Sequence, residues 1–268
     1  AVACLRAQQP TALDVLVIDD ASTDTTAEIA AQSGARVVSM PMNSGRGAVR
    51  AKGIELLEAD FIVSLDSGNR ISSDFVTCAI PLFDDDSVGA VIGHWAEPHP
   101  DSLARRWRAR HLFKIDRQPA HGQNCHLATH GCILRRSAIL AAGNFDPSLR
   151  HTEDNVLGHI LKNQGVRIVS CPSARVKPQT ADKLSSLARR YWRWHVGSTE
   201  SWSLSDYLKM VNNAHLVMVP RDWRARDFPS LLLTMLMPHW IALYTLKRKL
   251  WGKNPHLRST GHTADLSA

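Results

Sequence analysis

Three acidic clusters contain the residues of this chain whose types and spacing could do chemistry. Asp19 and Asp20 precede Ala-Ser-Thr-Asp, Asp66 precedes Ser-Gly-Asn, and the pair Glu153 and Asp154 follows His-Thr. The first two clusters come directly after short apolar runs of the kind that buried strands need. In open α/β sheets, ligands bind beyond the carboxyl ends of the strands, where loops from different strands converge. Carboxylates gathered there would bind a metal or another cation, or move protons.

Alternating strands and helices are predicted to position these clusters. The segments are strands at 14–18, 35–39 and 61–65, and helices from 22–24, over 47–57 and from 72–74. This repeat predicts an α/β fold with a mostly parallel sheet and helices on both of its faces. Glu153 and Asp154 are predicted to begin a further helix, whose N-terminus would help to hold negative charge.

Each cluster taken alone also has a purely structural interpretation. Asp19 and Asp20 could cap a helix, and Asp66 could lie in a solvated turn. Glu153 and Asp154 could be a charge pair in the first turn of a helix. The joint order of the clusters along the chain favours a functional site over these separate interpretations.

Five motifs in this order resemble the inverting glycosyltransferases of family 2, over roughly residues 4–194. They are Asp19-Asp20-Ala-Ser-Thr-Asp24, Asn43-Ser-Gly-Arg46-Gly-Ala48, Asp66-Ser-Gly68, Gly143-Asn-Phe-Asp146 followed by Glu153-Asp154, and Arg190-Tyr-Trp-Arg193-Trp194. The resemblance implies the GT-A fold of nucleotide-diphospho-sugar transferases. It also implies a nucleotide-sugar site, whose candidate residues are Asp19, Asp20, Arg46, Asp66, Arg190, Arg193 and Trp194.

The implied reaction needs these residue types. Transfer from a nucleotide sugar passes through an oxocarbenium-like state while negative charge grows on the leaving diphosphate. Asp154 is the candidate for the base that takes the proton of the acceptor hydroxyl, with Glu153 beside it. Arg190 and Arg193 are predicted to clamp the diphosphate, because guanidinium groups pair with phosphate oxygens in a bidentate way.

A divalent cation, Mn²⁺ or Mg²⁺, is the predicted cofactor. Asp66 is the candidate metal ligand, and Asn69 could supply a neutral oxygen. Gly68 stands where the family places a second aspartate, and Lys177 stands where many relatives have a histidine that completes the metal site. An ion held by Asp66, water and the donor is compatible with these departures, because magnesium needs few protein ligands.

Composition restricts the class of protein. The 268 residues carry a net charge of +7, spread over several short basic pairs without a recognised nucleic-acid module, which favours a phosphate-bearing donor and an anionic membrane as partners. The five cysteines are scattered and odd in number, as expected for a reducing compartment. His121, His126 and His130 are equally compatible with structural and with acceptor-facing roles.

Three regions are predicted along the chain. Residues 1–181 would be the GT-A domain, with its first strand apparently missing; 182–253 would be a helical, membrane-associated region; and 254–268 a flexible tail. The apolar stretch 228–246 has basic residues on both sides and Pro238 inside it. An interfacial helix is the favoured interpretation, with a membrane span and a core helix as alternatives. The expected location is the cytoplasmic face of the inner or plasma membrane.

The predicted function is a hexosyltransferase-like inverting glycosyltransferase that uses a UDP-, GDP- or dTDP-linked sugar. Its acceptor would be a glycan or a lipid-linked molecule, in the synthesis of a surface polysaccharide or glycolipid. Two other classes stay open at this point. One is a catalytically degenerate GT-A protein that serves as a scaffold or as a glycan- or nucleotide-binding subunit. The other is a nucleotidyltransferase that acts on sugar phosphates.

Overall fold

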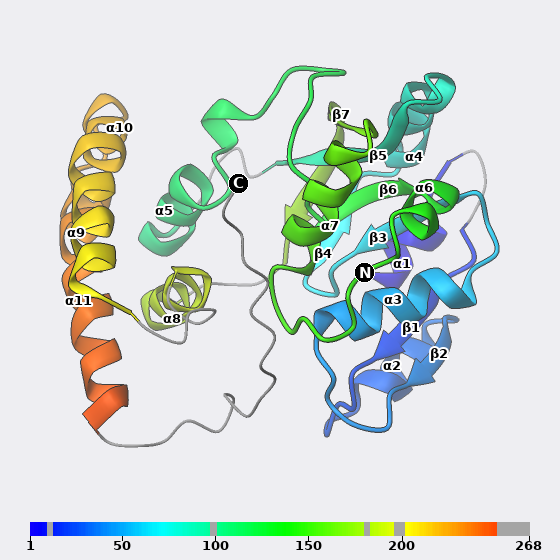
Figure 1. The fold of residues 1–268 in the computed structure, drawn as a ribbon, viewed down its shortest axis with the longest axis horizontal. Helices are drawn as coiled ribbons and strands as arrows, with labels where there is room; N and C mark the ends of the chain where they lie inside the picture. The colour runs from blue at the N-terminus through cyan, green and yellow to red at the C-terminus, as the bar shows by residue number, and fades with distance from the viewer. Residues whose placement is uncertain (10–12, 97–100, 180–182, 196–201, 251–268) are drawn as a thin grey trace. The chain divides into compact units, whose positions relative to one another are not determined.

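A computed structural model describes residues 1–9, 13–96, 101–179, 183–195 and 202–250, without the side chains of 193–195 and 249–250 (Figure 1). The chain forms two compact units, Ala1–Ala181 and Asp182–Ala268. The predicted tail at 254–268 lies outside the described residues. The assignment of the two units to a catalytic domain and a membrane-facing region stays a prediction.

The first unit is built on a five-stranded sheet. Its strands, in spatial order, are β3 (Phe61–Leu65), β6 (Gly131–Arg135), β5 (Val88–Trp95), β7 (Arg167–Pro178) and β4 (Asn69–Ile71). The α/β class is confirmed, but the expectation of mostly parallel pairing is corrected for this sheet. β6 is antiparallel to both of its neighbours and β4 is antiparallel to β7, so β5 and β7 form its one parallel pair. Strand direction could not be predicted, because the long connections before β6 and β7 allow either direction.

A parallel pair, β1 (Leu16–Asp19) and β2 (Arg36–Ser39), carries the first acidic cluster. Helices α2 (Thr26–Gln32) and α3 (Arg46–Leu56) pack on this pair, as the strand-helix pattern predicts. The predicted strand at 61–65 coincides with β3. The carboxyl ends of β1 and β3 therefore present Asp19 and Asp66 to the loops that follow them.

Apolar side chains cover both faces of the five-stranded sheet. On one face, α3, α6 (Arg136–Ala141) and α7 (Glu153–Asn163) pack on side chains that include Cys132 and Leu134. On the other face, α4 (Phe75–Ala79) and η1 (Ile80–Asp84) pack on Ile133. This alternation along β6 is the period-two pattern of a strand that is buried on both faces. The remaining elements of this unit are α1 (Val2–Arg6), α5 (Leu103–His111) and η2 (Ile115–Arg117).

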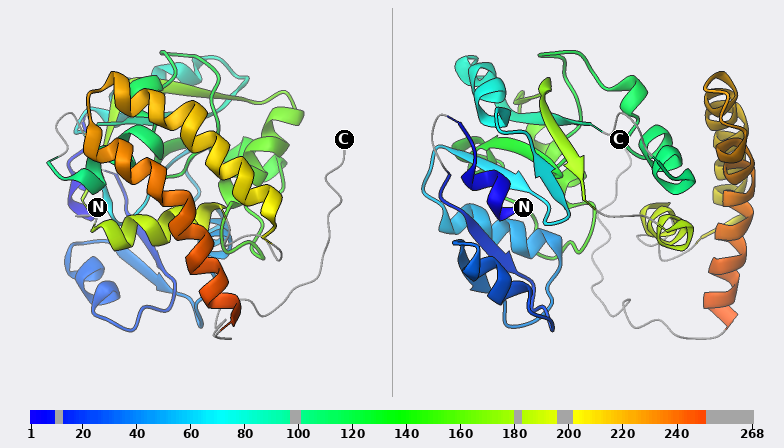
Figure 2. Two further views of the ribbon diagram at one scale, coloured as in Figure 1. Left: turned by 90° about the vertical axis from the view of Figure 1, so that its left-hand side faces the viewer. Right: turned by 180° about the vertical axis from the view of Figure 1, so that it is seen from behind.

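The second unit is helical in its described residues. It contains α8 (Leu184–His195), α9 (Leu204–Asn213), the π-helical turn η3 (Ala214–Met218), α10 (Val219–Arg224) and α11 (Phe228–Leu250). Ser203 and Asp206 form a reciprocal capping box at the start of α9. The views in Figure 2 show α9 and α11 side by side, and the two helices are in contact. The apolar stretch 228–246 is thus helical.

Candidate functional site

Arg50 joins two of the three acidic clusters. It lies on α3, and its Nη2 is 2.8 Å from Oδ1 of Asp66, directly after β3. The other terminal nitrogen of the same guanidinium forms an ion pair with Oε1 of Glu153, in the first turn of α7. Burial lowers the pKa of Arg50, whereas the nearby carboxylates of Asp66 and Asp154 raise it. The structure therefore brings Asp66, Glu153 and Asp154 together around one buried cation.

The sequence interpretation missed Arg50. Its signal is positional, because Arg50 follows Arg46 by four residues on the same helix and thus shares a face with it. Ala51 and Ile54 of this helix are buried against the sheet. A long cationic side chain at the edge of such a buried face is expected to form an ion pair with a carboxylate, since an unpaired buried charge is costly.

The start of α7 positions Glu153 and Asp154, the carboxylates predicted to provide the catalytic base. Thr152 has a left-handed backbone with φ of 64°, which turns the chain into the helix. Glu153 is 1% exposed, whereas Asp154 is half-buried. The carboxylate of Asp154 accepts a hydrogen bond of 2.9 Å from the backbone N–H of Asn155. Both carboxylates lie in the first helical turn, where the helix dipole favours negative charge.

The first acidic cluster holds the loop before α3. Asp20 accepts hydrogen bonds from the backbone N–H groups of Ser44 and Gly45, at 2.6 and 3.0 Å. Asp19 is buried and accepts from the N–H of Ser22 at 3.1 Å. Both carboxylates thus have structural partners, while Arg46 is exposed at the first position of α3. Contact of Asp19, Asp20 and Arg46 with a nucleotide stays a prediction.

The same loop packs on the turn that leads toward α7. The backbone N–H of Gly47 donates to the carbonyl of Leu149 at 3.0 Å. A Cβ atom on Gly47 would lie 2.1 Å from the carbonyl oxygen of Asp146, so only glycine fits there. Arg150 donates to the carbonyl of Asn43 at 2.9 Å. The Gly-rich and Gly-Asn-Phe-Asp motifs are therefore in direct contact.

The two candidate metal ligands, Asp66 and Asn69, provide one carboxylate between them. The side chain of Asp66 is 40% exposed, and Arg50 contacts only one of its two oxygens in the described structure. Asn69 is buried and donates its side-chain N–H to the carbonyl of His130 at 2.8 Å, which gives it a structural role. Within the described part of the chain, no three His, Cys, Asp or Glu side chains form a metal-binding group. These donors fit an ion held by Asp66, water and diphosphate oxygens, and do not fit a closed site.

A neutral histidine lies beside the carboxylates. His130 stacks on Trp95 with ring centroids 4.3 Å apart, and Trp95 stacks on Phe113 at 3.8 Å. Nε2 of His130 donates to the carbonyl of Gly93 at 3.2 Å. Burial lowers the pKa of His130 to about 4, although nearby carboxylates act in the opposite direction. The ring therefore stays uncharged at neutral pH, in a structural role.

Comparison with known proteins assigns the family. The family model described as "Glycosyl transferase family 2" matches residues 1–142, more than half of the chain. The chain belongs to this glycosyltransferase family. The predicted activity class is confirmed: the protein is a glycosyltransferase. The matched residues include Arg50 and Asp66 and end before α7.

Solved structures of glycosyltransferases share the fold of this family 2 protein. The mannosyltransferase PcManGT from Pyrobaculum calidifontis, in complex with GDP-Man and Mn²⁺, has a TM-score of 0.60 and 13% identity, with 94% of this chain and 83% of that chain covered. S. aureus TarS 1–349 in complex with UDP-GlcNAc has a TM-score of 0.52 and 17% identity, with 94% and 71% covered. These matches confirm the predicted GT-A fold. No curated protein matches the sequence.

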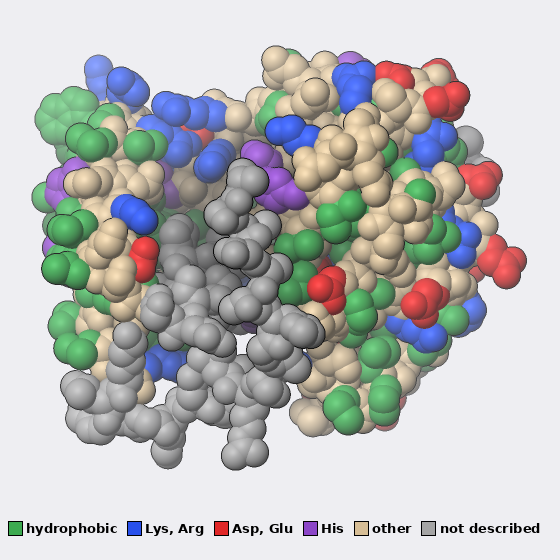
Figure 3. All heavy atoms as spheres, viewed as in Figure 1, with side chains coloured by type: hydrophobic (Ala, Val, Ile, Leu, Met, Phe, Trp, Pro, Cys, Tyr) green, Lys and Arg blue, Asp and Glu red, His purple; other side chains and the backbone are tan. Residues whose placement is uncertain are grey.

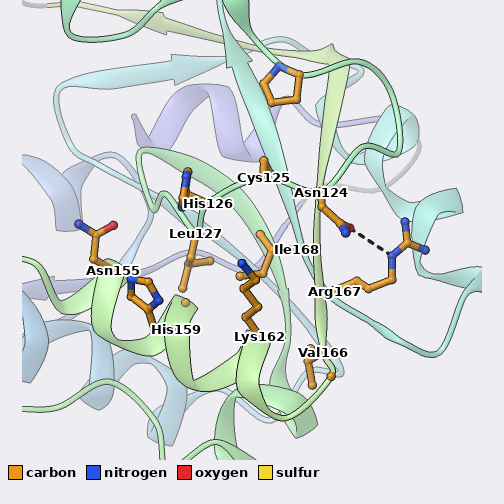
Figure 4. Close-up of a pocket in the computed structure, with 13 residues that line it drawn as sticks. Asn124, Cys125, His126, Leu127, Asn155, His159, Lys162, Val166, Arg167 and Ile168 are labelled. Carbon is orange, nitrogen blue, oxygen red and sulfur yellow. Dashed lines mark hydrogen bonds between the residues drawn. The ribbon is translucent and has the colours of Figure 1, made fainter. Parts of the chain in front are cut away.

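A pocket of about 510 Å³ opens on another side of α7 in the glycosyltransferase (Figure 4). Asn155, His159 and Lys162 line it from α7, and His126 and Leu127 line it from a loop. Arg167, at the start of β7, donates to the side chain of Asn124 at 3.3 Å. The lining residues include cations and imidazoles but no carboxylate, which suits an anionic or hydroxyl-rich ligand.

The remaining residues predicted to bind the donor lie in the second unit of the transferase. Arg190 lies on α8, and Arg193 and Trp194 belong to the same helix with side chains outside the described residues. Lys177, which replaces the expected histidine, is exposed on β7 opposite Arg70 of β4. The roles of Arg190, Arg193 and Trp194 in donor binding stay predictions.

The half-buried His130 makes stability depend on pH. Its pKa is about 4 in the folded protein and about 6.5 in the unfolded chain, so the unfolded state binds more protons between these values. We expect the free energy of unfolding to fall as pH decreases from 6.5 to 4, by up to about 3 kcal/mol. Urea unfolding at several pH values measures this change. His130→Phe keeps the ring stack and should flatten the slope in that window; an unchanged slope would assign the pH dependence to other groups.

Proposed function

We propose that this glycosyltransferase moves a sugar from a nucleotide-diphosphate donor to a hydroxyl of a glycan or lipid-linked acceptor, with inversion at the anomeric carbon. The observation that carries the proposal is the Arg50 bridge. It holds Asp66, at the end of β3, beside the helix that begins with Glu153 and Asp154. A donor-side carboxylate and a candidate base thus share one site.

The chemistry is one direct displacement. The acceptor oxygen attacks the anomeric carbon from the face opposite the diphosphate, and the bond between that carbon and the diphosphate oxygen breaks. Asp154 takes the proton of the attacking hydroxyl. Arg50 keeps buried Glu153 and Asp66 in place, and Arg46 in the first turn of α3 offers a cation to the diphosphate.

A divalent cation, Mn²⁺ or Mg²⁺, would be held by Asp66 and by the donor. When bound, it would neutralise the negative charge that develops on the leaving diphosphate. The PcManGT structure is a complex with GDP-Man and Mn²⁺, which supports a divalent cation together with a nucleotide-sugar donor for this chain. The single carboxylate predicts that the cation is held weakly and mainly together with the nucleotide.

Adding a second carboxylate tests this metal site. We expect Gly68→Asp to raise Mn²⁺-dependent nucleotide affinity roughly tenfold, because it adds an oxygen ligand two residues from Asp66. Gly68 does not have a left-handed backbone, so its backbone conformation is compatible with an aspartate. Calorimetry with and without Mn²⁺ measures the effect. Ser67→Asp adds the same charge at an exposed neighbouring position, and an equal gain in both variants would argue against coordination at position 68.

The pocket beside α7 supports an acceptor that carries phosphate or many hydroxyl groups. His159 and Lys162 line it on the helix that starts with Glu153 and Asp154. A lipid-linked sugar or a polysaccharide chain would provide such groups. Synthesis of a surface polysaccharide or glycolipid, at the cytoplasmic face of a membrane, is the setting we propose.

Binding and transfer assays test the proposed function. UDP, GDP and dTDP are titrated into the protein by calorimetry, and the matching sugar donors are then offered with lipid-linked and glycan acceptors. NMR spectroscopy of the product gives the anomeric configuration, for which we expect inversion. Retention would overturn the single displacement. Nucleotide binding without turnover for any acceptor would support the alternative of a binding subunit, and absence of nucleotide binding would contradict the proposal itself.

A further inference from the structure

Helix α11 exposes a row of large apolar side chains, while its buried side combines the polar Ser230, Thr234 and Thr245 with the apolar Met237 and Ile241. The exposed side chains recur at helical spacing and are Phe228, Leu232, Met235, Leu236, Leu243 and Leu246. Leu232 and Leu243 are 58% and 68% exposed, whereas Ser230 and Thr234 on the other side are 0% exposed. A surface helix of a water-soluble protein turns its apolar stripe toward the core, so a second, outward row of large apolar side chains indicates a partner.

Hydrogen bonds fix the buried side of α11 within its own unit. Thr234 donates its hydroxyl to the carboxylate of Asp222 on α10 at 2.6 Å, and Ser230 donates to Asp227 at 2.7 Å. Near the other end, the indole N–H of Trp192 on α8 donates to the hydroxyl of Thr245 at 2.9 Å. These bonds determine which side of α11 faces the protein. The apolar side faces outward along the length of the helix.

Neighbouring elements enlarge this apolar surface. Leu204 and Leu208 of α9, Leu216 of η3 and Trp223 of α10 are exposed large apolar side chains. Trp223 packs edge-on against Phe228, with ring centroids 5.6 Å apart. In Figure 3, hydrophobic side chains gather along the outer edge of α9, α10 and α11. We call these side chains, with the exposed stripe of α11, the apolar face of α9–α11. Soluble monomers rarely expose so extended an apolar patch.

The charges around this face favour an anionic partner. Residues 202–250 contain seven lysines and arginines and three aspartates, and two of these aspartates, Asp222 and Asp227, are buried. Arg224 and Arg226 are exposed just before α11, and Lys247 is exposed near its end. Basic residues beside an apolar helical face, with a tryptophan among them, are typical of helices that lie in the headgroup region of anionic bilayers.

The helix is long enough to cross a membrane, but its surroundings favour a position in the plane of the bilayer. Phe228–Arg248 meets the length and apolarity of a span. The buried side of α11 is hydrogen-bonded to Asp222 of α10, which also carries Arg221, and the hydroxyl of Tyr207 on α9 lies 2.8 Å from Nδ1 of His239. A span would carry these polar groups into hydrocarbon, which is costly. Binding by one face leaves them outside it.

We propose that the apolar face of α9–α11 docks the protein onto the surface of an anionic lipid bilayer. The leucine, phenylalanine and tryptophan side chains enter the boundary between headgroups and acyl chains, and Arg224, Arg226 and Lys247 contact lipid phosphates. The proposal goes beyond the transfer reaction, because it assigns a surface and a lipid chemistry, and it does not depend on the identity of the donor.

Vesicle flotation with the full chain tests the docking face. We expect binding to phosphatidylglycerol-containing vesicles, little binding to pure phosphatidylcholine vesicles, and release by high salt. The triple variant Leu232→Glu, Leu236→Glu, Leu243→Glu should bind at least roughly tenfold more weakly, because three large side chains leave the lipid. The double variant Ile29→Glu, Leu140→Glu changes exposed apolar residues of the first unit and should bind like the unchanged protein.

Melting temperature and nucleotide binding show whether the triple variant is folded; a variant with Leu232, Leu236 and Leu243 changed to serine replaces it if it is not. Equal vesicle binding by the variant and the unchanged protein would overturn the proposal. So would retention on vesicles after high salt and alkaline carbonate, which indicates a span. An unchanged protein that ignores vesicles and forms a dimer that the variant lacks would assign the face to a second copy. Nucleotide binding is measured separately, so failure of docking does not imply failure of the transferase proposal.

Discussion

Asp154→Asn is expected to reduce sugar transfer by about 10²- to 10⁴-fold, the usual contribution of a positioned general base. Asparagine keeps the size of the side chain and can remain in the first turn of α7, but it cannot take the proton of the acceptor hydroxyl. Donor binding should stay within about twofold of the unchanged protein, because Arg50 pairs with Glu153 and Asp66. A transfer assay and nucleotide calorimetry measure the two quantities separately.

Asp86→Asn is the matched control for this experiment. The Asp86 side chain is fully exposed at the surface and lies 3.9 Å from Arg135. The same chemical change there should leave both transfer and binding unaltered. If Asp154→Asn transfers sugar at the rate of the control, Asp154 is not the base and the assignment moves to another carboxylate of the site. If it loses nucleotide binding as well, Asp154 acts on the donor side.

Arg50→Met is expected to lower the free energy of unfolding by about 3–5 kcal/mol, because it leaves the buried carboxylate of Glu153 without its cation. Methionine preserves most of the length of the side chain, so loss of charge rather than loss of volume dominates. Nucleotide binding should also weaken, since Asp66 loses its fixed position. Urea unfolding and calorimetry give the two values.

Two further variants separate the effect of losing the buried ion pair from the effect of changing helix propensity. Glu153→Gln combined with Arg50→Met removes both members of the buried pair and should recover a large part of the lost stability. Arg46→Met changes the exposed arginine one turn earlier on α3 and should leave stability within about 0.5 kcal/mol. Equal losses for Arg46→Met and Arg50→Met would show that helix propensity, and not the buried ion pair, accounts for the result.

The sequence pattern was sufficient to predict the strand and the helix that carry the second and third acidic clusters. An apolar run between Asp60 and Asp66 predicted the strand at Phe61–Leu65, and the acidic pair Glu153–Asp154 predicted the start of a helix, because both signals are local. The antiparallel course of β6 was not predictable in this way. Strand direction depends on how a long connection returns to the sheet, and neither periodicity nor propensity encodes that path.

The bridging role of Arg50 could also not be predicted from the sequence. An ion pair between α3, the end of β3 and α7 depends on contacts across 16 residues in one case and about a hundred in the other. For α11, composition predicted an apolar helix, but the choice of its buried side rests on hydrogen bonds of Ser230 and Thr234 that only the folded unit defines. The interfacial interpretation of residues 228–246 stays a prediction, and the structure shows which side of the helix is exposed.

The contact of Gly47 with the carbonyl of Asp146 has a mechanical consequence. Because no side chain fits between these two backbones, we expect a displacement of the loop that follows Asn43 to displace the turn that ends near Arg150 as well. The loop carries Arg46, and the turn leads directly into Glu153 and Asp154. Any displacement of the loop by an incoming nucleotide would shift the start of α7 with it, so the two halves of the site cannot be adjusted independently. A change of donor preference would thus require compensating changes in both segments.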